Sequence, residues 1–233
     1  YYDGILVHAD PELTKLDMSW PLTSDVTAML RYTGYVAPPA PQQHPDSAGA
    51  GEIVVSAGGG PVGQALFECA IKAAKRSPLR WRLLVGGANA EARIAELKTL
   101  ADDPMIKIEP VRPDFRQMLH HVTASVSMCG YNTALDVLQT GVPAVFVPFD
   151  DGGEVEQTLR ARALSVQPGI EVLSATDLTP QSLMAEIKRV ASKDRRSPSG
   201  LRMNGAASVP YTPLATPTHE KMNSTGGAVT HKH

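Results

Sequence analysis

The sequence predicts an α/β fold, with a Rossmann-like doubly wound parallel sheet over residues 52–193. Three observations support this prediction. Short β-branched runs alternate with amphipathic segments of helical length, so the hydrophobic period switches repeatedly between that of a strand and that of a helix. Strands joined by helices of this length form parallel pairs with right-handed crossovers. The strands are apolar on both faces, as expected of a sheet that helices cover on both sides.

The sequence also predicts where the strands and helices of this domain begin and end. Asn89 is a candidate N-cap, and Thr179 with Pro180 marks the start of the last helix. The expected strands are 52–57, 81–86, 106–110, 124–128 and 144–149, and the expected helices are 61–77, 89–102, 114–122, 131–140, 154–164 and 179–193.

Three further segments flank the sheet domain. Residues 1–36 hold the strand-like "GILVHAD", the helix-like "SDVTAML" and the extended "YTGYV". These are too few elements to close a domain, and the missing initial methionine indicates a fragment, so we expect the remnant of an N-terminal domain. Residues 37–51 are rich in proline, glutamine and glycine and predict an inter-domain linker or mobile loop. Residues 194–233 have few large apolar side chains and predict a disordered tail.

Composition narrows the class of protein. The chain has 233 residues, is 42% apolar and carries a net charge of −2, so it can bury an ordinary core and has no excess charge that would attract nucleic acid. No apolar run approaches the roughly 20 residues of a membrane helix. Cys69 and Cys129 lie in apolar periodic segments, where buried thiols are expected rather than a disulfide or a metal site. These features predict a cytoplasmic protein that binds no nucleic acid.

A glycine-rich loop follows the first predicted strand. Gly58, Gly60 and Gly63 in "SAGGGPVG" satisfy G-x-G-x-x-G, the spacing of dinucleotide-binding turns. Such a site also needs an acidic residue after the second strand, and "LLVGGANA" has none. The loop can still bring backbone amides to a phosphate or sugar at a helix N-terminus. A tight turn without a ligand is the alternative.

The segment "SMCGYNTALDVLQTGVPAVFVPF" (127–149) brings a second helix start to the carboxyl edge of the sheet, where ligands of open parallel sheets bind. Gly130 lets the backbone approach a ligand, and Asn132 and Thr133 add side-chain donors to the helix N–H groups, which suits a diphosphate. Asp136 lies one turn further and can accept two hydrogen bonds from a ribose diol. Alternatively, Asn132 and Thr133 cap the helix and Asp136 is a solvated acid.

This segment also resembles a known signature. "CGYNTALDVLQTGVPAVFVPF" followed by "EVEQ" is similar to the nucleotide-sugar signature of GT-B glycosyltransferases. Residues 52–193 resemble the C-terminal donor domain of glycosyltransferase family 28, which includes the bacterial N-acetylglucosaminyltransferases of the peptidoglycan lipid precursor. The plant secondary-product glycosyltransferase box has "CGWNS", an acidic residue and "GVP" in the same order. "VHADP" and "YTGYV" resemble the end of the matching N-terminal acceptor domain.

The resemblance implies a set of donor-binding residues. Gly130, Asn132 and Thr133, with Tyr131 between them, would meet the diphosphate. Asp136 would hold the ribose hydroxyls where the family usually has glutamate. The rest of the implied set comprises the backbone of Val111 and Arg112 around the uracil ring, Gly59 and Gly60 facing the sugar and phosphates, and Glu156 and Gln157 at the donor-sugar hydroxyls.

Some positions depart from the signature. Met128 stands where the plant box has histidine, which leaves more of the phosphate contact to backbone amides. The loop before the Glu156–Gln157 pair is longer than the family spacing. Asp150 and Asp151 are adjacent, whereas metal-dependent transferases have a D-x-D spacing, so we expect a solvated loop and no metal.

Histidines are the remaining candidates for acid–base chemistry. His8 ends the strand "GILVHAD" and is a weak candidate for the catalytic base, with a structural role as the alternative. In the resembling enzymes the base belongs to the N-terminal domain. His120 and His121 lie on a predicted helix away from the proposed cleft, and the terminal "HKH" is expected to be solvated.

Together these features predict the donor-binding domain of an inverting, metal-independent glycosyltransferase that uses no cofactor. The donor would be a UDP-sugar, by resemblance a UDP-N-acetylhexosamine, and the acceptor is an unidentified hydroxyl. The missing N-terminal half, or a partner subunit, would bind the acceptor and allow peripheral membrane association. The alternatives are a nucleotide-binding subunit that is inactive without such a partner, an NAD-dependent oxidoreductase, and a nucleotide-sugar epimerase of the same fold.

Overall fold

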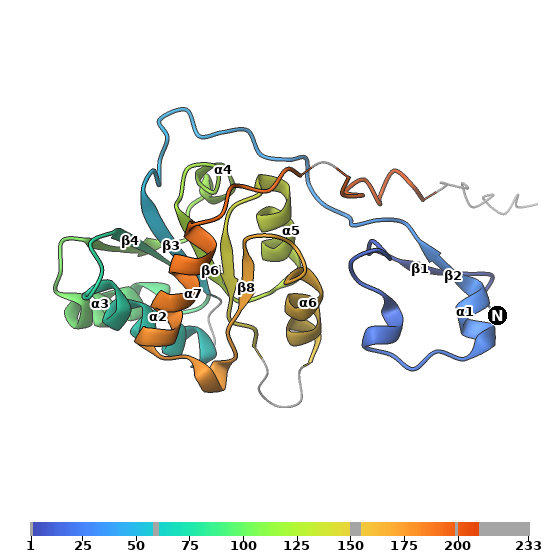
Figure 1. Cartoon of the computed structure of the whole chain (residues 1–233), viewed down its shortest axis with the longest axis horizontal. Coiled ribbons are helices and arrows are strands. Elements are labelled where there is room, and N and C mark those ends of the chain that lie inside the picture. Colours follow the sequence, from blue (N-terminus) through green and yellow to red (C-terminus); the bar gives the residue numbers. More distant parts are fainter. Residues whose placement is uncertain (1, 58–60, 150–154, 199, 210–233) are drawn as a thin grey trace, which may run out of the picture.

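The computed structural model describes residues 2–57, 61–149, 155–198 and 200–209. At its centre lies a sheet of six parallel strands in the order β5-β4-β3-β6-β7-β8 (Figure 1). The chain starts in the middle of the sheet, moves outward to β5, and then returns to the other side of β3. This is the doubly wound arrangement, so the predicted fold class is confirmed. The strands are β3 (Glu52–Ala57), β4 (Arg80–Val85), β5 (Ile106–Pro110), β6 (Ala124–Ser127), β7 (Ala144–Phe146) and β8 (Ile170–Val172).

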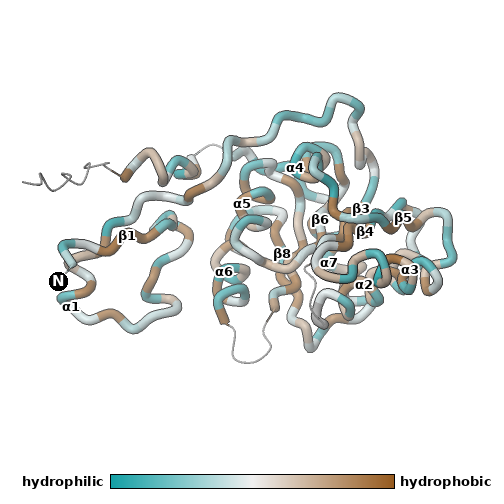
Figure 2. The backbone as a smooth tube through the Cα atoms, turned by 180° about the vertical axis from the view of Figure 1, so that it is seen from behind, coloured by the Kyte–Doolittle hydropathy of each residue, from teal (hydrophilic) through white to brown (hydrophobic). Residues whose placement is uncertain are grey.

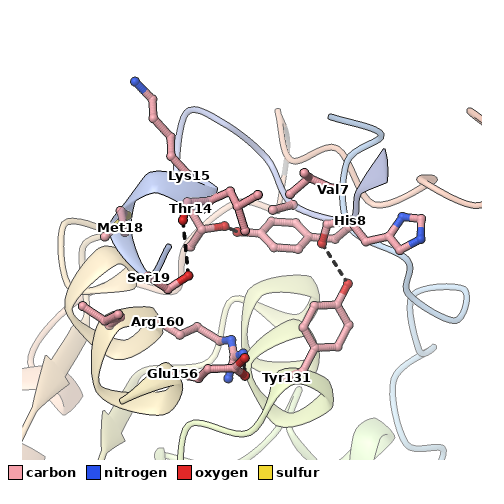
Figure 3. Close-up of a pocket in the computed structure, with 13 residues that line it drawn as sticks. Val7, His8, Thr14, Lys15, Met18, Ser19, Tyr131, Glu156 and Arg160 are labelled. Carbon is pink, nitrogen blue, oxygen red and sulfur yellow. Dashed lines mark hydrogen bonds and ion pairs between the residues drawn. The ribbon is translucent and has the colours of Figure 1, made fainter. Parts of the chain in front are cut away.

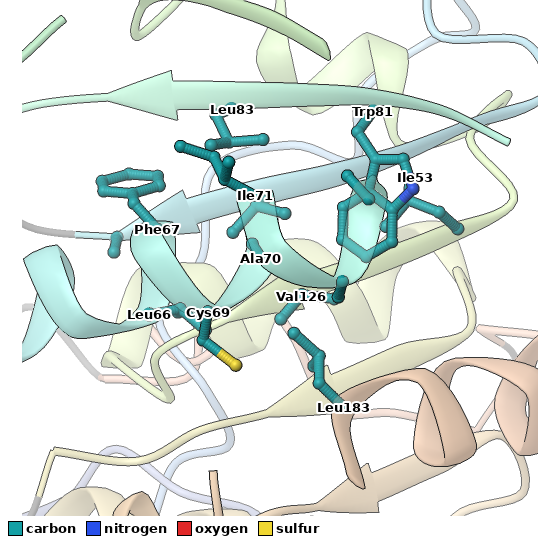
Figure 4. Close-up of a cluster of buried hydrophobic side chains, with 14 of the residues drawn as sticks. Ile53, Leu66, Phe67, Cys69, Ala70, Ile71, Trp81, Leu83, Val126 and Leu183 are labelled. Carbon is teal, nitrogen blue, oxygen red and sulfur yellow. The ribbon is translucent and has the colours of Figure 1, made fainter. Parts of the chain in front are cut away.

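Helices cover both faces of this sheet. One apolar cluster joins the sheet to α2 (Pro61–Ala74), α3 (Ala90–Ala101) and α7 (Pro180–Ala191). The other joins it to α4 (Phe115–Met118), α5 (Tyr131–Thr140) and α6 (Glu156–Leu164). Figure 4 shows the first cluster, where Phe67 and Ile71 of α2 pack against Leu83 and Trp81 of β4. Neighbouring residues of a strand belong to opposite clusters, which explains why apolar residues of one strand face both sides of the sheet.

Helix ends follow the sequence signals in part. Thr179 caps α7 by accepting a hydrogen bond from the Ser182 amide, and Pro180 occupies the first turn, as predicted. Asn89 stands at the N-cap of α3 but has a left-handed backbone and makes no capping hydrogen bond. The helix predicted at 114–122 is only the four residues of α4, because the chain must turn into β6 within a short crossover.

The N-terminal segment lies apart from the six-stranded sheet (Figure 1). Its strands β1 (Ile5–Val7) and β2 (Leu30–Tyr32) form a parallel pair. Between them lie the short 3-10 helix η1 (Leu16–Met18) and the helix α1 (Ser24–Met29). Another 3-10 helix, η3 (Ala175–Asp177), precedes α7 in the main domain.

Side chains of α4, α5 and the turn after α4 hold the predicted linker 37–51 against the domain. The Gln139 side-chain amide donates to the Pro38 carbonyl at 2.8 Å, and Arg116 donates to the Pro39 carbonyl at 3.1 Å. The Nε2 atom of His120 lies 2.9 Å from the Pro41 carbonyl oxygen. Figure 2 shows this linker as mostly white to teal, while many residues of the strands and helices of the domain are brown, that is, apolar. Polar contacts therefore anchor a segment that has little apolar surface.

Residues within 194–198 and 200–209 form hydrogen bonds with the rest of the chain, which differs from the disordered tail predicted to begin at residue 194. Arg196 donates to the carbonyl oxygens of Pro168 and Val142, at 2.9 and 2.6 Å. Gly141, with a φ of 66°, allows this approach, because a Cβ atom there would collide with the Arg196 carbonyl oxygen. The segment then runs back to the N-terminal segment, where the Tyr35 amide donates to the Arg202 carbonyl (Figure 1). Composition missed this segment because hydrogen bonds from Arg195 and Arg196 to backbone carbonyls, not apolar side chains, hold it in place.

Candidate functional site

A cavity of about 420 Å³ lies at the carboxyl ends of β3, β4, β5 and β6. It covers the carboxyl ends of the paired strands β3 and β6, where the order of the strands reverses direction across the sheet and where open α/β sheets bind their ligands. Five residues of the set named from the sequence line it: Val111, Gly130, Thr133, Asp136 and Gln157. Residues far apart in the sequence therefore meet at one edge of the sheet.

The start of α5 forms one wall of this cavity. Gly130 is the N-cap residue and has an ordinary φ of −63°. A Cβ atom added to Gly130 would meet no described atom within 4 Å, so neither backbone conformation nor packing in that part of the chain requires a glycine here. The first N–H groups of a helix have no intrahelical acceptor, and the helix dipole adds about half a positive charge at this end. The geometry can therefore accept an anion.

Thr133 and Asn132 differ in their placement. Thr133 lines the cavity, and its hydroxyl makes no hydrogen bond to another described residue. Asn132 is exposed and does not line the cavity. No side chain caps α5, so the alternative in which these two residues cap the helix is wrong.

Asp136 is largely buried at the cavity wall, with its side chain 14% exposed. Its Oδ1 atom accepts a hydrogen bond from Nε of Arg116 at 2.6 Å. Burial raises the pKa of the Asp136 carboxyl, and the Arg116 guanidinium offsets part of this rise. The alternative of a solvated acid is therefore wrong.

Val111 and Arg112 follow β5 and point in different directions. The Val111 side chain is 54% exposed and lines the cavity, and its amide donates to the Val85 carbonyl. The Arg112 guanidinium binds the carboxylate of Asp114, and this contact holds the pKa of that carboxyl well below its usual range. The side chain of Arg112 is thus committed to an ion pair, and only its backbone stays next to the cavity residue Val111.

Gln157 and Glu156 begin α6 and face different cavities. Gln157 lines the cavity described above, and its Oε1 atom accepts a hydrogen bond from the Phe149 amide at 3.3 Å. Glu156 is 72% exposed and lies 3.6 Å from Arg160, one turn along α6. It lines a second cavity of about 170 Å³ between the N-terminal segment and the starts of α5 and α6.

Tyr131 and His8 also line this second cavity (Figure 3). The Tyr131 hydroxyl donates to the His8 carbonyl oxygen at 3.3 Å and accepts from the Val36 amide at 3.1 Å. The imidazole of His8 is turned away from Glu156 and Arg160, and its Nδ1 atom lies 2.8 Å from the Thr33 hydroxyl. Tyr131 therefore connects α5 with the N-terminal segment, and the role of His8 as a base stays a prediction.

Several predicted positions lie outside the described residues: Gly58, Gly59, Gly60, Asp150, Asp151 and the terminal "HKH". Within the part of the chain that is described, no group of three or more His, Cys, Asp or Glu side chains is placed to hold a metal ion. None of the helices formed by these residues has the length and apolar character needed to cross a membrane.

Sequence reasoning missed four residues at these cavities. Ser56, at the end of β3, and Phe115, at the start of α4, line the first cavity. Arg116 binds Asp136 from α4, and Arg160 donates to the Cys129 carbonyl at 2.8 Å beside the start of α5. Its position at the end of a strand could have indicated Ser56, whereas the two arginines have no local signal, because their partners lie 20 or more residues away in the sequence.

Comparison with known proteins places this geometry in a family. Residues 53–209 match the profile of the glycosyltransferase family 28 C-terminal domain. The chain belongs to this family. The glycosyltransferase of kitacinnamycin has a similar structure with a TM-score of 0.61 and 20% identity, covering 88% of this chain and 51% of that one. Acinetobacter baumannii MurG gives a TM-score of 0.55 and 17% identity, covering 79% and 57%. At these identities the likeness supports the fold of the family 28 domain.

Curated relatives of the family 28 domain share one name, UDP-N-acetylglucosamine--N-acetylmuramyl-(pentapeptide) pyrophosphoryl-undecaprenol N-acetylglucosamine transferase. The protein from Levilactobacillus brevis is 26% identical over 113 residues, which are 48% of this chain and 30% of that protein. The protein from Allorhizobium ampelinum is 35% identical over 81 residues, which are 34% of this chain and 22% of that protein. The matched part thus spans less than a third of these relatives' length.

Proposed function

We propose that this family 28 domain is the donor-binding half of a bacterial glycosyltransferase and that the cavity at the sheet edge binds a UDP-sugar. The observation that carries the proposal is the meeting of Gly130, Thr133 and Asp136 with Val111 and Gln157 around one cavity. The family match favours glycosyl transfer over an NAD-dependent oxidoreductase, and the named relatives suggest UDP-N-acetylglucosamine as the donor.

In this proposal each wall of the cavity meets one part of the donor. The diphosphate lies at the start of α5, where amide groups and the Thr133 hydroxyl donate to its oxygens. Room for this approach is present because Gly130 has no side chain. The Asp136 carboxylate accepts hydrogen bonds from the ribose diol. Val111 flanks the uracil ring, and the amide of Gln157 reaches the donor sugar.

The reaction would be a direct displacement with inversion. An acceptor hydroxyl forms a bond to the anomeric carbon as the bond to the diphosphate oxygen breaks, and the hydroxyl proton passes to a base on the acceptor side. The α5 N-terminus stabilises the charge that develops on the leaving diphosphate, which is the task a metal ion performs in other transferases. We propose that the reaction here is metal-independent.

The acceptor half would come from a further domain or a partner subunit, through which the enzyme can associate peripherally with a membrane. The support is the N-terminal segment, whose strands β1 and β2 pair only with each other among the described residues. A two-stranded sheet is marginal by itself, and its open edges can accept further strands. If this half is supplied separately, the chain alone is a nucleotide-binding subunit without activity.

Calorimetric titration of the chain with UDP in the presence of a chelator tests the proposal. We expect binding without a divalent cation and much weaker binding of NAD. Binding that requires magnesium or manganese would refute metal independence, and preference for NAD would revive the oxidoreductase. The chain alone should transfer sugar from UDP-N-acetylglucosamine to no acceptor above background, and turnover by it would refute the need for a second half.

A further inference from the structure

Arg116 stands directly behind the wall of the donor cavity. It lies on α4 and does not line the cavity, but its Nε atom donates to Oδ1 of Asp136 at 2.6 Å. One terminal nitrogen, Nη2, donates to Oε1 of Gln139 at 2.7 Å and to the Pro39 carbonyl at 3.1 Å. Gln139 is in turn fixed by the Pro38 carbonyl at 2.8 Å. Hydrogen bonds to Gln139 and Pro39 therefore hold the Arg116 guanidinium in place while its Nε atom binds the Asp136 carboxylate.

We propose that Arg116 is a positioning residue for ribose recognition: it fixes the Asp136 carboxylate through Oδ1 and leaves Oδ2 to accept hydrogen bonds from the ribose hydroxyls. This inference rests on the proposed function. Among the described residues Oδ2 has no hydrogen-bond partner, so this oxygen stays available to a ligand. A guanidinium held in a fixed plane orients a carboxylate more strictly than a lysine ammonium, which acts as a point charge.

Arg116 also favours the ionised form of Asp136. Burial favours the neutral form of this carboxyl, and Arg116 is the one charged group of the described chain that lowers its pKa. Its other neighbours in this cluster, Gln139 and Thr140 on α5 and Pro39 of the linker, carry no charge. The ionised carboxylate is a stronger acceptor than the protonated carboxyl, so loss of Arg116 would weaken ribose binding most at low pH.

The test compares Arg116→Met with the parent chain in calorimetric titrations with UDP and with 2′,3′-dideoxy-UDP, which lacks the ribose hydroxyls. We expect UDP affinity to fall about 5- to 30-fold and dideoxy-UDP affinity to change less than about twofold. Arg116→Lys keeps the charge and should restore part of the UDP affinity. It also serves as the second variant if Arg116→Met does not fold. As the pH is lowered, UDP affinity should begin to fall at a higher pH for Arg116→Met than for the parent. Without Arg116 the pKa of Asp136 is higher, so this carboxyl takes up its proton at a higher pH.

Arg195→Met is the matched control. Arg195 donates to the Leu119 and Val122 carbonyls in the connection between α4 and β6, and it neither binds Asp136 nor lines the cavity. This variant should bind both nucleotides like the parent. Equal weakening of UDP and dideoxy-UDP by Arg116→Met, or unchanged UDP affinity, would overturn the positioning role alone. Absence of UDP binding by the parent would overturn the proposed function and this inference with it.

Discussion

Two substitutions on α5 separate phosphate recognition from ribose recognition. Thr133→Ala removes a hydroxyl that lines the cavity and has no partner among the described residues. Asp136→Asn removes a negative charge that binds Arg116 and keeps the shape of the side chain. In the proposed function the first change affects the diphosphate and the second affects the ribose. UDP and uridine distinguish them, because uridine has the ribose and lacks the phosphates.

The magnitudes follow from the kind of hydrogen bond that is lost. A neutral hydroxyl contributes about 0.5–1.5 kcal/mol, so Thr133→Ala should weaken UDP roughly 2- to 13-fold and leave uridine nearly unchanged. A charge-assisted bond contributes about 1.5–3 kcal/mol, so Asp136→Asn should weaken both ligands roughly 10- to 150-fold.

The two positions should also differ in how their substitution affects the thermal stability of the protein. Alanine is the better helix former by up to about 0.7 kcal/mol, so Thr133→Ala should melt no lower than the parent. The sequence alone suggests that loss of Asp136 scarcely affects folding. The structure revises this expectation, because Asp136 is largely buried and ion-paired, and Asp136→Ala would leave Arg116 without its carboxylate. Asparagine keeps an acceptor for Arg116 and is therefore the better probe.

Calorimetry with both ligands and thermal melting of each variant form the assay. The refuting result is that both variants bind UDP as the parent does. Thr133 and Asp136 would then be structural residues of α5, and the cavity would need another explanation. Equal weakening of UDP and uridine by Thr133→Ala would refute the placement of the diphosphate at the start of α5.

Two further predictions concern stability. Arg112 lowers the pKa of Asp114, so this pair contributes stability above the unfolded-state pKa of about 3.9 that is lost as the pH falls through the folded-state pKa. Urea unfolding should therefore show that Asp114→Asn is destabilised at pH 7 and approaches the parent as the pH falls below about 4, and a gap that does not shrink would contradict the assignment. A chain ending at Lys193 should melt several degrees below one ending at Val209, because it lacks the carbonyl contacts of Arg195 and Arg196; equal melting would show that residues 194–209 do not stabilise the domain.

The sequence predicts the sheet domain well because its signals are local. Most strands contain a short run of apolar residues, and each long helix has an apolar side that packs on the sheet. The strand order and the short strand β8 (Ile170–Val172) are not predicted, because right-handed crossovers leave more than one arrangement and β8 has only three residues. The exception among the helices is α4, which is shorter than its pattern predicts. There the short connection between β5 and β6 outweighs helix propensity.

The cavity can be predicted in part for a similar reason. Val111, Gly130 and Thr133 each follow the carboxyl end of a strand, so the topology alone brings them to one edge. Local sequence patterns do not predict side-chain contacts between elements that lie far apart in the sequence. Arg116 meets Asp136, and Arg196 meets the Val142 carbonyl, only because the fold brings α4 and the C-terminal segment against α5. A polar residue on a short helix or in a proline-rich stretch gives no sign of such a partner.

Residues of the first turns of α5 and α6 line both cavities, and in the proposed function this arrangement limits where the reaction would occur. On α5, Thr133 lines the larger cavity and Tyr131 the smaller one. On α6, Gln157 lines the larger cavity and Glu156 lines the smaller one. A nucleotide held in the larger cavity would therefore extend its sugar across these two helix starts toward the N-terminal segment. The acceptor would approach from the side of the smaller cavity, so contacts such as that of Tyr131 with the His8 carbonyl lie where donor and acceptor binding would influence each other.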